Sequence, residues 1–158
     1  MENNFKIVLY TPEIPGNTGS IGRTCVALGI ELILIGPLGF EISEKAVRRA
    51  GLDYWKFVSI KEYQNWDEFL KTESPTREQL LFFENNQKQN FYEGNYSENC
   101  YLIFGAETKG LPQEIYQEYE DRMYCLPMYS DKIRSLNLSN TATTVAYECL
   151  RQLNFKNA

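Results

Sequence analysis

Histidine is absent from this 158-residue chain, which removes the side chain that most often serves as a general base or a metal ligand. Any proton transfer must therefore use another group. Apolar stretches are also short, and none approaches the roughly 20 residues that a membrane-spanning helix needs. Residues 1–6 have no charged-then-apolar export signal. We therefore expect a cytoplasmic protein with no metal site and no membrane segment.

Cysteine is sparse, and basic side chains are outnumbered by acidic ones. No two cysteines have the close spacing of a zinc site or a redox motif, so reduced, buried thiols are expected at Cys25, Cys100, Cys125 and Cys149. Sixteen Lys and Arg against 21 Asp and Glu give a net charge of -5. Because binding to nucleic acid without sequence preference depends on clustered basic side chains, this balance argues against such binding over the whole surface. Local basic patches remain compatible with RNA.

What the sequence does contain is a series of short, continuous apolar runs, which are typical of parallel strands covered on both faces. The runs are residues 5–10, 31–35, 55–58, 79–83, 100–104 and 123–126. Helices are expected between several of them, at residues 19–28, 43–50, 65–71 and 112–117. The polar stretch 84–98 is expected to be a surface connection. This order predicts one α/β domain over residues 1–158, with a mostly parallel sheet flanked by helices.

A final helix is predicted after Ser139, whose side chain can cap it. Apolar residues from Ala142 to Leu153 follow the spacing of one helix face, which indicates a core or a dimer interface. Tyr147 lies about 120° from the centre of that face, so the same burial does not explain it. Tyr147 is therefore a candidate contact for a partner.

Three polar loops each follow an apolar run and precede a helix, and we expect them to form one composite site. The first loop, residues 12–23, brings glycines to a helix N-terminus, where unpaired N–H groups and the helix dipole could hold a phosphate. The glycines could equally serve close packing of this helix. Arg23 lies one helical turn after Gly19, so its guanidinium can reach the mouth of the turn.

The second loop, residues 104–112, ends a buried strand, and its two glycines allow a flat ligand to approach the backbone. Glu107 offers a carboxylate there, or it caps the following helix. The third loop, residues 126–140, has the period of neither a strand nor a helix, so something other than core packing is expected to order it. Neither Gly-x-Gly-x-x-Gly nor a P-loop is present, which argues against ordinary nucleotide binding.

Together the three loops resemble the signature motifs of the SPOUT superfamily of RNA methyltransferases. The motifs read Asn17-x-Gly19-x-x-x-Arg23, Phe104-Gly-x-Glu-x-x-Gly-Leu-Pro112, and Leu126-Pro-Met with Arg134-Ser-Leu-Asn-Leu-Ser-Asn140. Two further segments, Arg48-Arg-Ala-Gly-Leu-Asp-Tyr54 and Tyr147-Glu148, resemble the small branch that 2′-O-methylates the wobble nucleotide of tRNA.

The resemblance implies a C-terminal deep trefoil knot, S-adenosylmethionine as the cofactor, and a homodimer whose two chains complete each site. It implies 2′-O-methylation of the ribose of cytidine or a modified uridine at position 34, in the anticodon stem-loop of tRNA. It makes Arg23 the catalytic residue. Cofactor contacts are implied at Phe83, Gly105, Leu126 and Ser135. Contacts to the RNA are expected at Asn17, Glu107, Arg134, Asn137 and Tyr147.

Arg23 is not expected to act as a base, because a guanidinium holds its proton too firmly at neutral pH. We expect Arg23 to orient the 2′-hydroxyl and to stabilise the developing alkoxide. Tyr147 or Tyr129 could stack on the unpaired nucleotide. RNA docking is expected to use the basic residues Lys45, Arg48, Arg49, Lys109, Lys132 and Arg134, although the first three could simply lie on a solvated helix face.

Two other functions fit the same residues: 2′-O-methylation at another tRNA or rRNA position, and RNA binding without catalysis. A conventional Rossmann methyltransferase is disfavoured, because the sequence Ile35-Gly-Pro-Leu stands where that fold would carry an acidic residue for the ribose.

Overall fold

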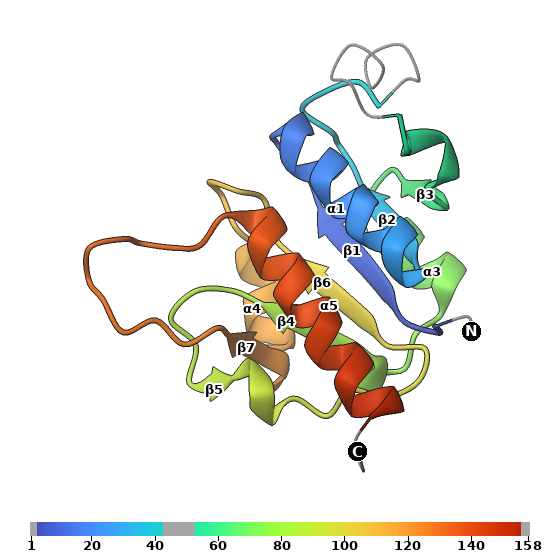
Figure 1. Cartoon of the computed structure of the whole chain (residues 1–158). Helices are drawn as coiled ribbons and strands as arrows, with labels where there is room; N and C mark the ends of the chain where they lie inside the picture. The colour runs from blue at the N-terminus through green and yellow to red at the C-terminus, as the bar shows by residue number, and fades with distance from the viewer. Residues whose placement is uncertain (1–2, 43–52, 156–158) are drawn as a thin grey trace.

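The computed structural model describes residues 3–42 and 53–155, and its strands form one seven-stranded sheet (Figure 1). The order is β3-β2-β1-β6-β4-β7-β5, and every pairing is parallel. The strands are β1 (Lys6–Tyr10), β2 (Glu31–Ile35), β3 (Ile60–Tyr63), β4 (Leu80–Phe83), β5 (Gln89–Asn90), β6 (Tyr101–Phe104) and β7 (Met123–Cys125). The prediction of a parallel α/β sheet is confirmed.

Helices cover both faces of the sheet, with α1 and α5 on the near side in Figure 1 and α3 and α4 on the far side. The helices are α1 (Pro15–Leu28), α3 (Trp66–Glu73), α4 (Gln113–Glu118) and α5 (Leu138–Asn154). Single 3-10 turns are η1 (Trp55–Phe57), η2 (Arg77–Gln79), η3 (Phe91–Glu93) and η4 (Glu120–Arg122). None of the helices in the described part of the chain is long and apolar enough to cross a membrane.

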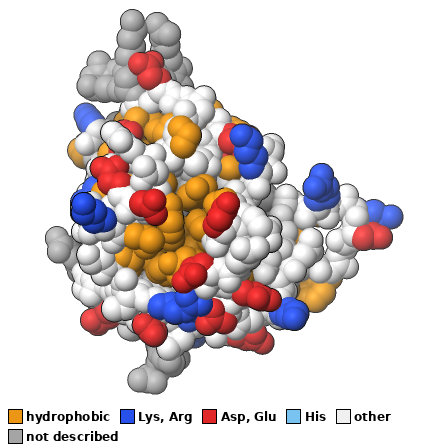
Figure 2. All heavy atoms as spheres, turned by 180° about the vertical axis from the view of Figure 1, so that it is seen from behind, with side chains coloured by type: hydrophobic (Ala, Val, Ile, Leu, Met, Phe, Trp, Pro, Cys, Tyr) orange, Lys and Arg blue, Asp and Glu red, His pale blue; other side chains and the backbone are white. Residues whose placement is uncertain are grey.

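Each central strand contributes to two separate cores, which explains its continuous apolar sequence. In β1, Ile7 and Leu9 join the core under α1 and α5, whereas Val8 points into the core under α3 and α4. Seen from the α3 and α4 side, apolar side chains gather at the centre of the face, with acidic side chains around them (Figure 2). Partly buried Tyr10 and Trp66 pack against this second core.

Two strands differ from the prediction. The run at residues 55–58 was expected to be a strand, but it forms the turn η1, because Trp55 packs against α1 where Gly22 leaves room for its ring. The strand β3 follows it instead. Within the stretch expected to be a surface connection, Gln89 and Asn90 form the edge strand β5, whose pairing with β7 no local periodicity indicates.

Two helices begin earlier than predicted, and one lies outside the described residues. The helix expected at 19–28 starts at Pro15, because proline suits the first helical turn. The cap of α5 is Asn137 rather than Ser139, since the Asn137 Oδ1 atom accepts the Ser139 N–H at 2.9 Å. The expected helix at 43–50, with Lys45, Arg48 and Arg49, is not among the described residues.

The C-terminal strand β7 lies between β4 and β5, which are consecutive in sequence. The segment 84–88 that joins β4 to β5 therefore passes beyond the end of β7, where the Cys125 thiol donates to the Gln87 carbonyl at 3.3 Å. The chain then runs through an exposed loop, residues 126–137, and returns as α5 beside α1. The Thr24 and Thr143 hydroxyls meet there at 2.7 Å.

All four cysteines are free thiols. Cys25, Cys100 and Cys149 are buried, as predicted. Cys125 is only half-buried, because it ends β7 at the edge of a cavity.

Candidate functional site

A cavity of about 440 Å³ lies at the carboxyl ends of β4, β6 and β7. The carboxyl edge of a parallel sheet is where α/β proteins commonly bind ligands. The cavity is lined by Ile14 and Asn17 of the first loop, by residues 83–85, by residues 104–110 of the second loop, and by residues 135–138 of the third. The three loops singled out by the sequence therefore meet at one cavity.

Glu107 holds the second loop to the start of α1. Its carboxylate accepts the N–H groups of Glu13 at 2.9 Å and Ile14 at 2.7 Å, and the Asn17 side-chain amide donates to it at 3.2 Å. An anion at this place is stabilised because the first N–H groups of a helix have no partner within the helix. Glu107 thus lies at the cavity, as the sequence predicts. The alternative that it caps the following helix is wrong, because it binds the start of α1, where its carboxylate takes the place proposed for a phosphate.

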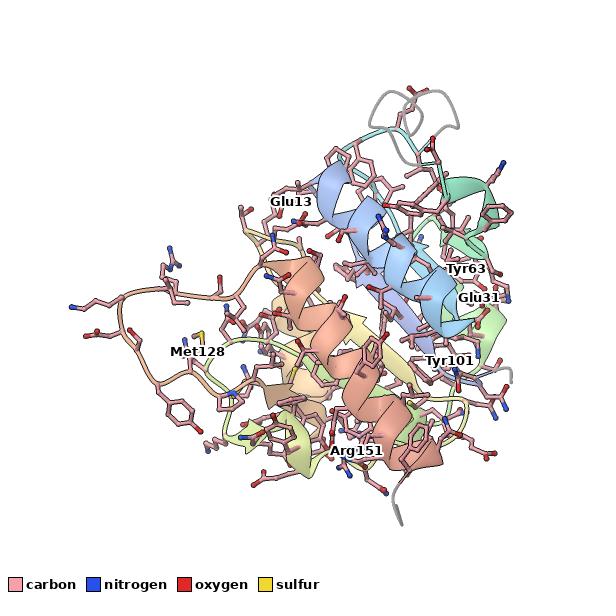
Figure 3. All side chains as sticks on the ribbon, viewed as in Figure 1. Glu13, Glu31, Tyr63, Tyr101, Met128 and Arg151 are labelled. Atoms are coloured by element: carbon pink, nitrogen blue, oxygen red, sulfur yellow. The ribbon has the colours of Figure 1, made fainter. Side chains whose placement is uncertain are left out.

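Glu13 makes the reciprocal contact from the first loop to the second (Figure 3). Its carboxylate accepts the Thr108 N–H at 3.0 Å and the Thr108 hydroxyl at 2.7 Å. These hydrogen bonds from Thr108 hold the pKa of Glu13 below its ordinary value. Each loop thus supplies a carboxylate to the backbone of the other, which fixes their relative position.

Asn17 and Asn137 extend this network to the third loop. The Asn137 side-chain amide donates to the Asn17 Oδ1 atom at 3.0 Å, while Asn17 donates to Glu107. Asn137 also caps α5. A continuous chain of hydrogen bonds therefore joins the three loops: Asn17 bonds to Glu107 across 90 positions of sequence and to Asn137 across 120.

The four residues expected to contact a cofactor all line the cavity: Phe83, Gly105, Leu126 and Ser135. Phe83 stacks on Phe104 with ring centroids 5.1 Å apart, which makes an apolar wall. Gly105 can carry no side chain, because a Cβ atom there would lie 2.5 Å from the Gly110 carbonyl carbon. The second loop therefore folds back closely on itself at the end of β6.

These features fit a nucleoside-containing cofactor such as S-adenosylmethionine. The volume falls within the range of small-molecule sites, and the wall is aromatic. A wider cleft of about 1030 Å³ continues along the third loop, where Arg134 lines it and Tyr129 is 97% exposed. The described residues contain no group of three or more His, Cys, Asp or Glu placed to hold a metal ion.

Three residues expected at the site do not line this cavity: Arg134, which lines only the wider cleft, and Arg23 and Tyr147, which lie on helices. Arg23 is exposed on α1, and its guanidinium lies 5.4 Å from the centre of the Tyr54 ring. The Tyr54 hydroxyl donates to the Gly19 carbonyl at 2.9 Å, so Tyr54 is anchored to the same helix. Tyr147 is 49% exposed on α5, away from the core as its spacing predicted. The side chains of Arg23 and Tyr147 both lie on the α1 and α5 layer.

The structure adds one carboxylate that the sequence reasoning missed. Glu84 follows β4 directly and lines the cavity, where the Leu111 N–H donates to its Oε1 atom at 2.7 Å. Burial raises the pKa of Glu84, and hydrogen bonds from Leu111, Tyr116 and Asn85 only partly oppose this. The signal was available, because an acidic residue directly after an apolar strand falls at the same edge of the sheet as Glu107.

Comparison with known proteins gives a consistent result. Residues 4–147 match the model of the SpoU rRNA Methylase family. The tRNA (cytidine(34)-2′-O)-methyltransferase of Saccharophagus degradans is 45% identical, over 96% of this chain and 97% of that protein.

Two solved structures extend the comparison. One, concerned with the 2-OH methylation of C/U34 on tRNA, has a TM-score of 0.82 and 38% identity, covering 94% of this chain and 95% of that chain. The other is the SpoU methyltransferase AviRb from Streptomyces viridochromogenes in complex with the cofactor AdoMet. It has a TM-score of 0.78 and 25% identity, and the match covers 97% of this chain and 62% of that chain.

Proposed function

The chain belongs to the SpoU rRNA methylase family, and from this premise we propose that it is a tRNA (cytidine(34)-2′-O)-methyltransferase. Its reaction is the S-adenosylmethionine-dependent 2′-O-methylation of the wobble ribose, on cytidine or a modified uridine at position 34. The observation that carries the proposal is the 45% identity with an enzyme of this activity over almost the full length of both chains. The convergence of the three loops on one cavity supports it independently.

The cofactor is assigned to the cavity at the ends of β4, β6 and β7. Phe83, Gly105, Leu126 and Ser135 would hold it there, because each of them lines the cavity. When bound, S-adenosylmethionine supplies a methyl group activated by its attachment to a sulfonium. Holding both reactants in line can contribute about 7 to 11 kcal/mol to such a transfer, so rigid loops are the main requirement. The hydrogen-bonded chain from Glu107 to Asn137 provides that rigidity.

Arg23 is assigned to the ribose. Its guanidinium would grip a neighbouring phosphate, orient the 2′-hydroxyl and stabilise the alkoxide that develops there, while the proton leaves to water. A role as a general base is disfavoured, because arginine keeps its proton at neutral pH. The exposure of Arg23 on α1, outside the cavity of its own chain, suits a group that meets a substrate from outside.

We infer a homodimer, and the position of Arg23 supports it. Arg23 and Tyr147 both lie exposed on the α1 and α5 layer, whereas the cavity opens at the carboxyl edge of the sheet. If a second copy packs on this layer, Arg23 of one chain can serve the cavity of the other. This arrangement would complete each site from two chains.

RNA recognition divides the five expected residues into two groups. Arg134 and Tyr147 are exposed and would contact the anticodon stem-loop directly. The polar atoms of Asn17, Glu107 and Asn137 are engaged with one another, so these residues would act by fixing the loops against which the RNA lies.

The finer features of the fold belong to the same proposal. The crossing of residues 84–88 beyond β7, followed by the return of α5 to the α1 side, supports a deep trefoil knot in the C-terminal part. Residues 1–158 would form a single SPOUT methyltransferase domain. A cytoplasmic location accords with tRNA as the substrate.

The decisive experiment gives the purified protein a methyl-labelled cofactor and, separately, total tRNA and rRNA. The RNA is then digested, and the methylated nucleoside is identified by mass spectrometry and located in its fragment. We expect 2′-O-methylcytidine, or a 2′-O-methylated modified uridine, at position 34 of tRNA. Label at another tRNA position or in rRNA would refute the substrate. Cofactor binding without label in either RNA would instead indicate an RNA-binding protein without catalysis.

A further inference from the structure

Glu84 is a carboxylate of the cavity that the proposed mechanism does not use. Its carboxylate has room there because the two residues that pack against it in space are glycines. A Cβ atom on Gly105 would lie 2.6 Å from the Glu84 Oε1 atom, and one on Gly110 would lie 2.9 Å from it. With the Leu111 N–H bound to the same oxygen, the carboxylate is held at the base of the second loop and on the wall of the cavity.

The groups that stabilise the negative charge of Glu84 are all neutral. The Leu111 N–H donates to the carboxylate, and the neutral Tyr116 hydroxyl and Asn85 N–H also lower its pKa. Among the described residues it forms no ion pair. Glu107, which lines the same cavity, differs because the N-terminus of α1 offsets its charge. The remaining charged side chain on the wall, Lys109, is exposed to solvent.

An uncompensated carboxylate in a partly dehydrated cavity attracts cations over several ångströms without touching them, since charges are screened less there than in water. The methyl donor carries a sulfonium charge, and the product of the transfer, S-adenosylhomocysteine, has lost it. The two ligands otherwise share the same adenosine, ammonium and carboxylate groups.

We propose that Glu84 makes the cavity selective for charge, so that it binds the cationic methyl donor in preference to the neutral product. Methyl transfer would then lower the affinity of the cavity for the bound product and favour its release. This inference rests on the assignment of S-adenosylmethionine to the cavity.

The test is the affinity of Glu84→Gln for three ligands, measured by titration calorimetry without RNA. The ligands are S-adenosylmethionine, S-adenosylhomocysteine and sinefungin, which carries an amine in place of the sulfonium. Glutamine still accepts the Leu111 N–H, so the loop should keep its position. We expect the affinity for the two cationic ligands to fall about tenfold and the affinity for S-adenosylhomocysteine to change little.

Glu62→Gln is the matched control, because it removes the same charge from an exposed position on β3, at the other end of the sheet. It should change none of the three affinities. Equal losses for all ligands in Glu84→Gln would overturn the proposal in favour of a contact to a shared part of the ligand. Unchanged affinities would overturn it in favour of a purely structural role.

If Glu84→Gln does not fold, a measurement on the wild-type protein tests the proposal instead. The preference for S-adenosylmethionine over S-adenosylhomocysteine should decline as the pH is lowered, because protonation of Glu84 removes the attraction, and burial raises the pKa of this carboxyl above its ordinary value. Tyr116 of α4 and the loop residues Asn85, Glu107 and Lys109 are the other polar groups around it. A constant preference would overturn the proposal. Failure of the wild type to bind any of the three ligands would overturn the proposed function as well.

Discussion

Arg23 and Glu107 show how differently two charged residues of the same motifs can be placed. Glu107 is engaged by three donors from the first loop and holds the cavity together. Arg23 is exposed on the outer side of α1, where the ring of Tyr54 lies beneath its guanidinium. One residue therefore shapes the site, whereas the other is available to a substrate.

The assignment of Arg23 to the ribose predicts the behaviour of Arg23→Lys. Lysine keeps the positive charge but loses the planar fork that can hold a phosphate and a hydroxyl together. We expect kcat to fall at least about 100-fold at every pH from 6 to 10, with the affinity for S-adenosylmethionine unchanged. The measurement is a pH series of single-turnover rates on tRNA.

The control for this series is Arg151→Lys, the same substitution at an exposed position near the end of α5. It should leave the rates unchanged. Recovery of activity by Arg23→Lys at high pH would contradict the orienting role, since it would indicate that loss of a proton from this side chain drives the reaction.

At the scale of secondary-structure elements, α3 is tied to the sheet by one carboxylate, Glu73, whose side chain is 7% exposed. The Tyr101 hydroxyl of β6 donates to it at 2.9 Å, the Tyr63 hydroxyl of β3 also donates to it, and Lys61 lies 3.4 Å away. Figure 3 shows Tyr63 and Tyr101 near each other at this side of the molecule. Burial alone would raise the pKa of Glu73, but these partners outweigh it and hold the pKa below its ordinary value.

This arrangement predicts a stability that depends on pH. A carboxylate with a lowered pKa in the folded state stabilises the protein above the pKa of the unfolded chain, and this contribution is lost as the pH falls through the folded-state pKa. Glu73→Gln should lower the free energy of unfolding by about 1 to 3 kcal/mol at pH 7. The deficit should begin to shrink below about pH 4.3, where the unfolded wild-type chain takes up a proton at Glu73. It should be smallest below the lowered folded-state pKa, where the folded protein is protonated as well.

Urea unfolding of the two proteins at several pH values measures this difference. Glu78→Gln, at an exposed position of η2, is the matched control and should follow the wild type at every pH. A deficit of constant size down to pH 3 would indicate lost packing rather than a lost charge.

At the scale of the whole molecule, the separation of Arg23 from the cavity predicts complementation between two inactive chains. Arg23→Ala removes the arginine, and Ser135→Phe fills the cavity that Ser135 lines. Each variant alone should be inactive. Co-expressed in equal amounts, they should recover about a quarter of the wild-type activity, because half of the dimers would contain one intact site out of two.

Tagging the two chains differently allows the mixed dimer to be purified before its activity is measured. Activity near half of the wild-type value per dimer is expected for this species. An inactive mixed dimer would show that each chain uses its own Arg23 and would remove the shared site.

Because the chain has a net charge of -5, it must bind RNA through local basic side chains. The salt dependence of the affinity for RNA tests this. If exposed basic side chains of the third loop, such as Arg134 in the wide cleft and the neighbouring Lys132, engage about four phosphates of the anticodon loop, log affinity should fall with log salt at a slope near -3. Fluorescence titration of an anticodon stem-loop between about 50 and 200 mM salt measures the slope. Lys132→Ala should reduce it by roughly 0.7, and a flat response would refute this docking.

The amino-acid sequence by itself determined the class of fold, the order of most elements and the three loops of the site. Continuous apolar runs such as that of β1 report burial on both faces, and local caps and glycines report helix ends, because these effects act within a few residues. Local sequence patterns predicted the wrong element where contacts between distant residues determine the structure. Trp55 forms a turn instead of a strand because it packs on Gly22, and Gln89 and Asn90 form a strand because β7 lies beside them.

Only the tertiary structure decided which loop atoms are already engaged and which remain for a ligand. Glu107 caps α1 across 93 positions of sequence, Asn17 and Asn137 meet across 120, and Glu84 fits because Gly105 and Gly110 fold around it. Hydrogen bonds and excluded volume between distant segments arise only when the chain has closed on itself. For this reason the motifs located the site, while its electrostatics, including the charge of Glu84, followed from the fold.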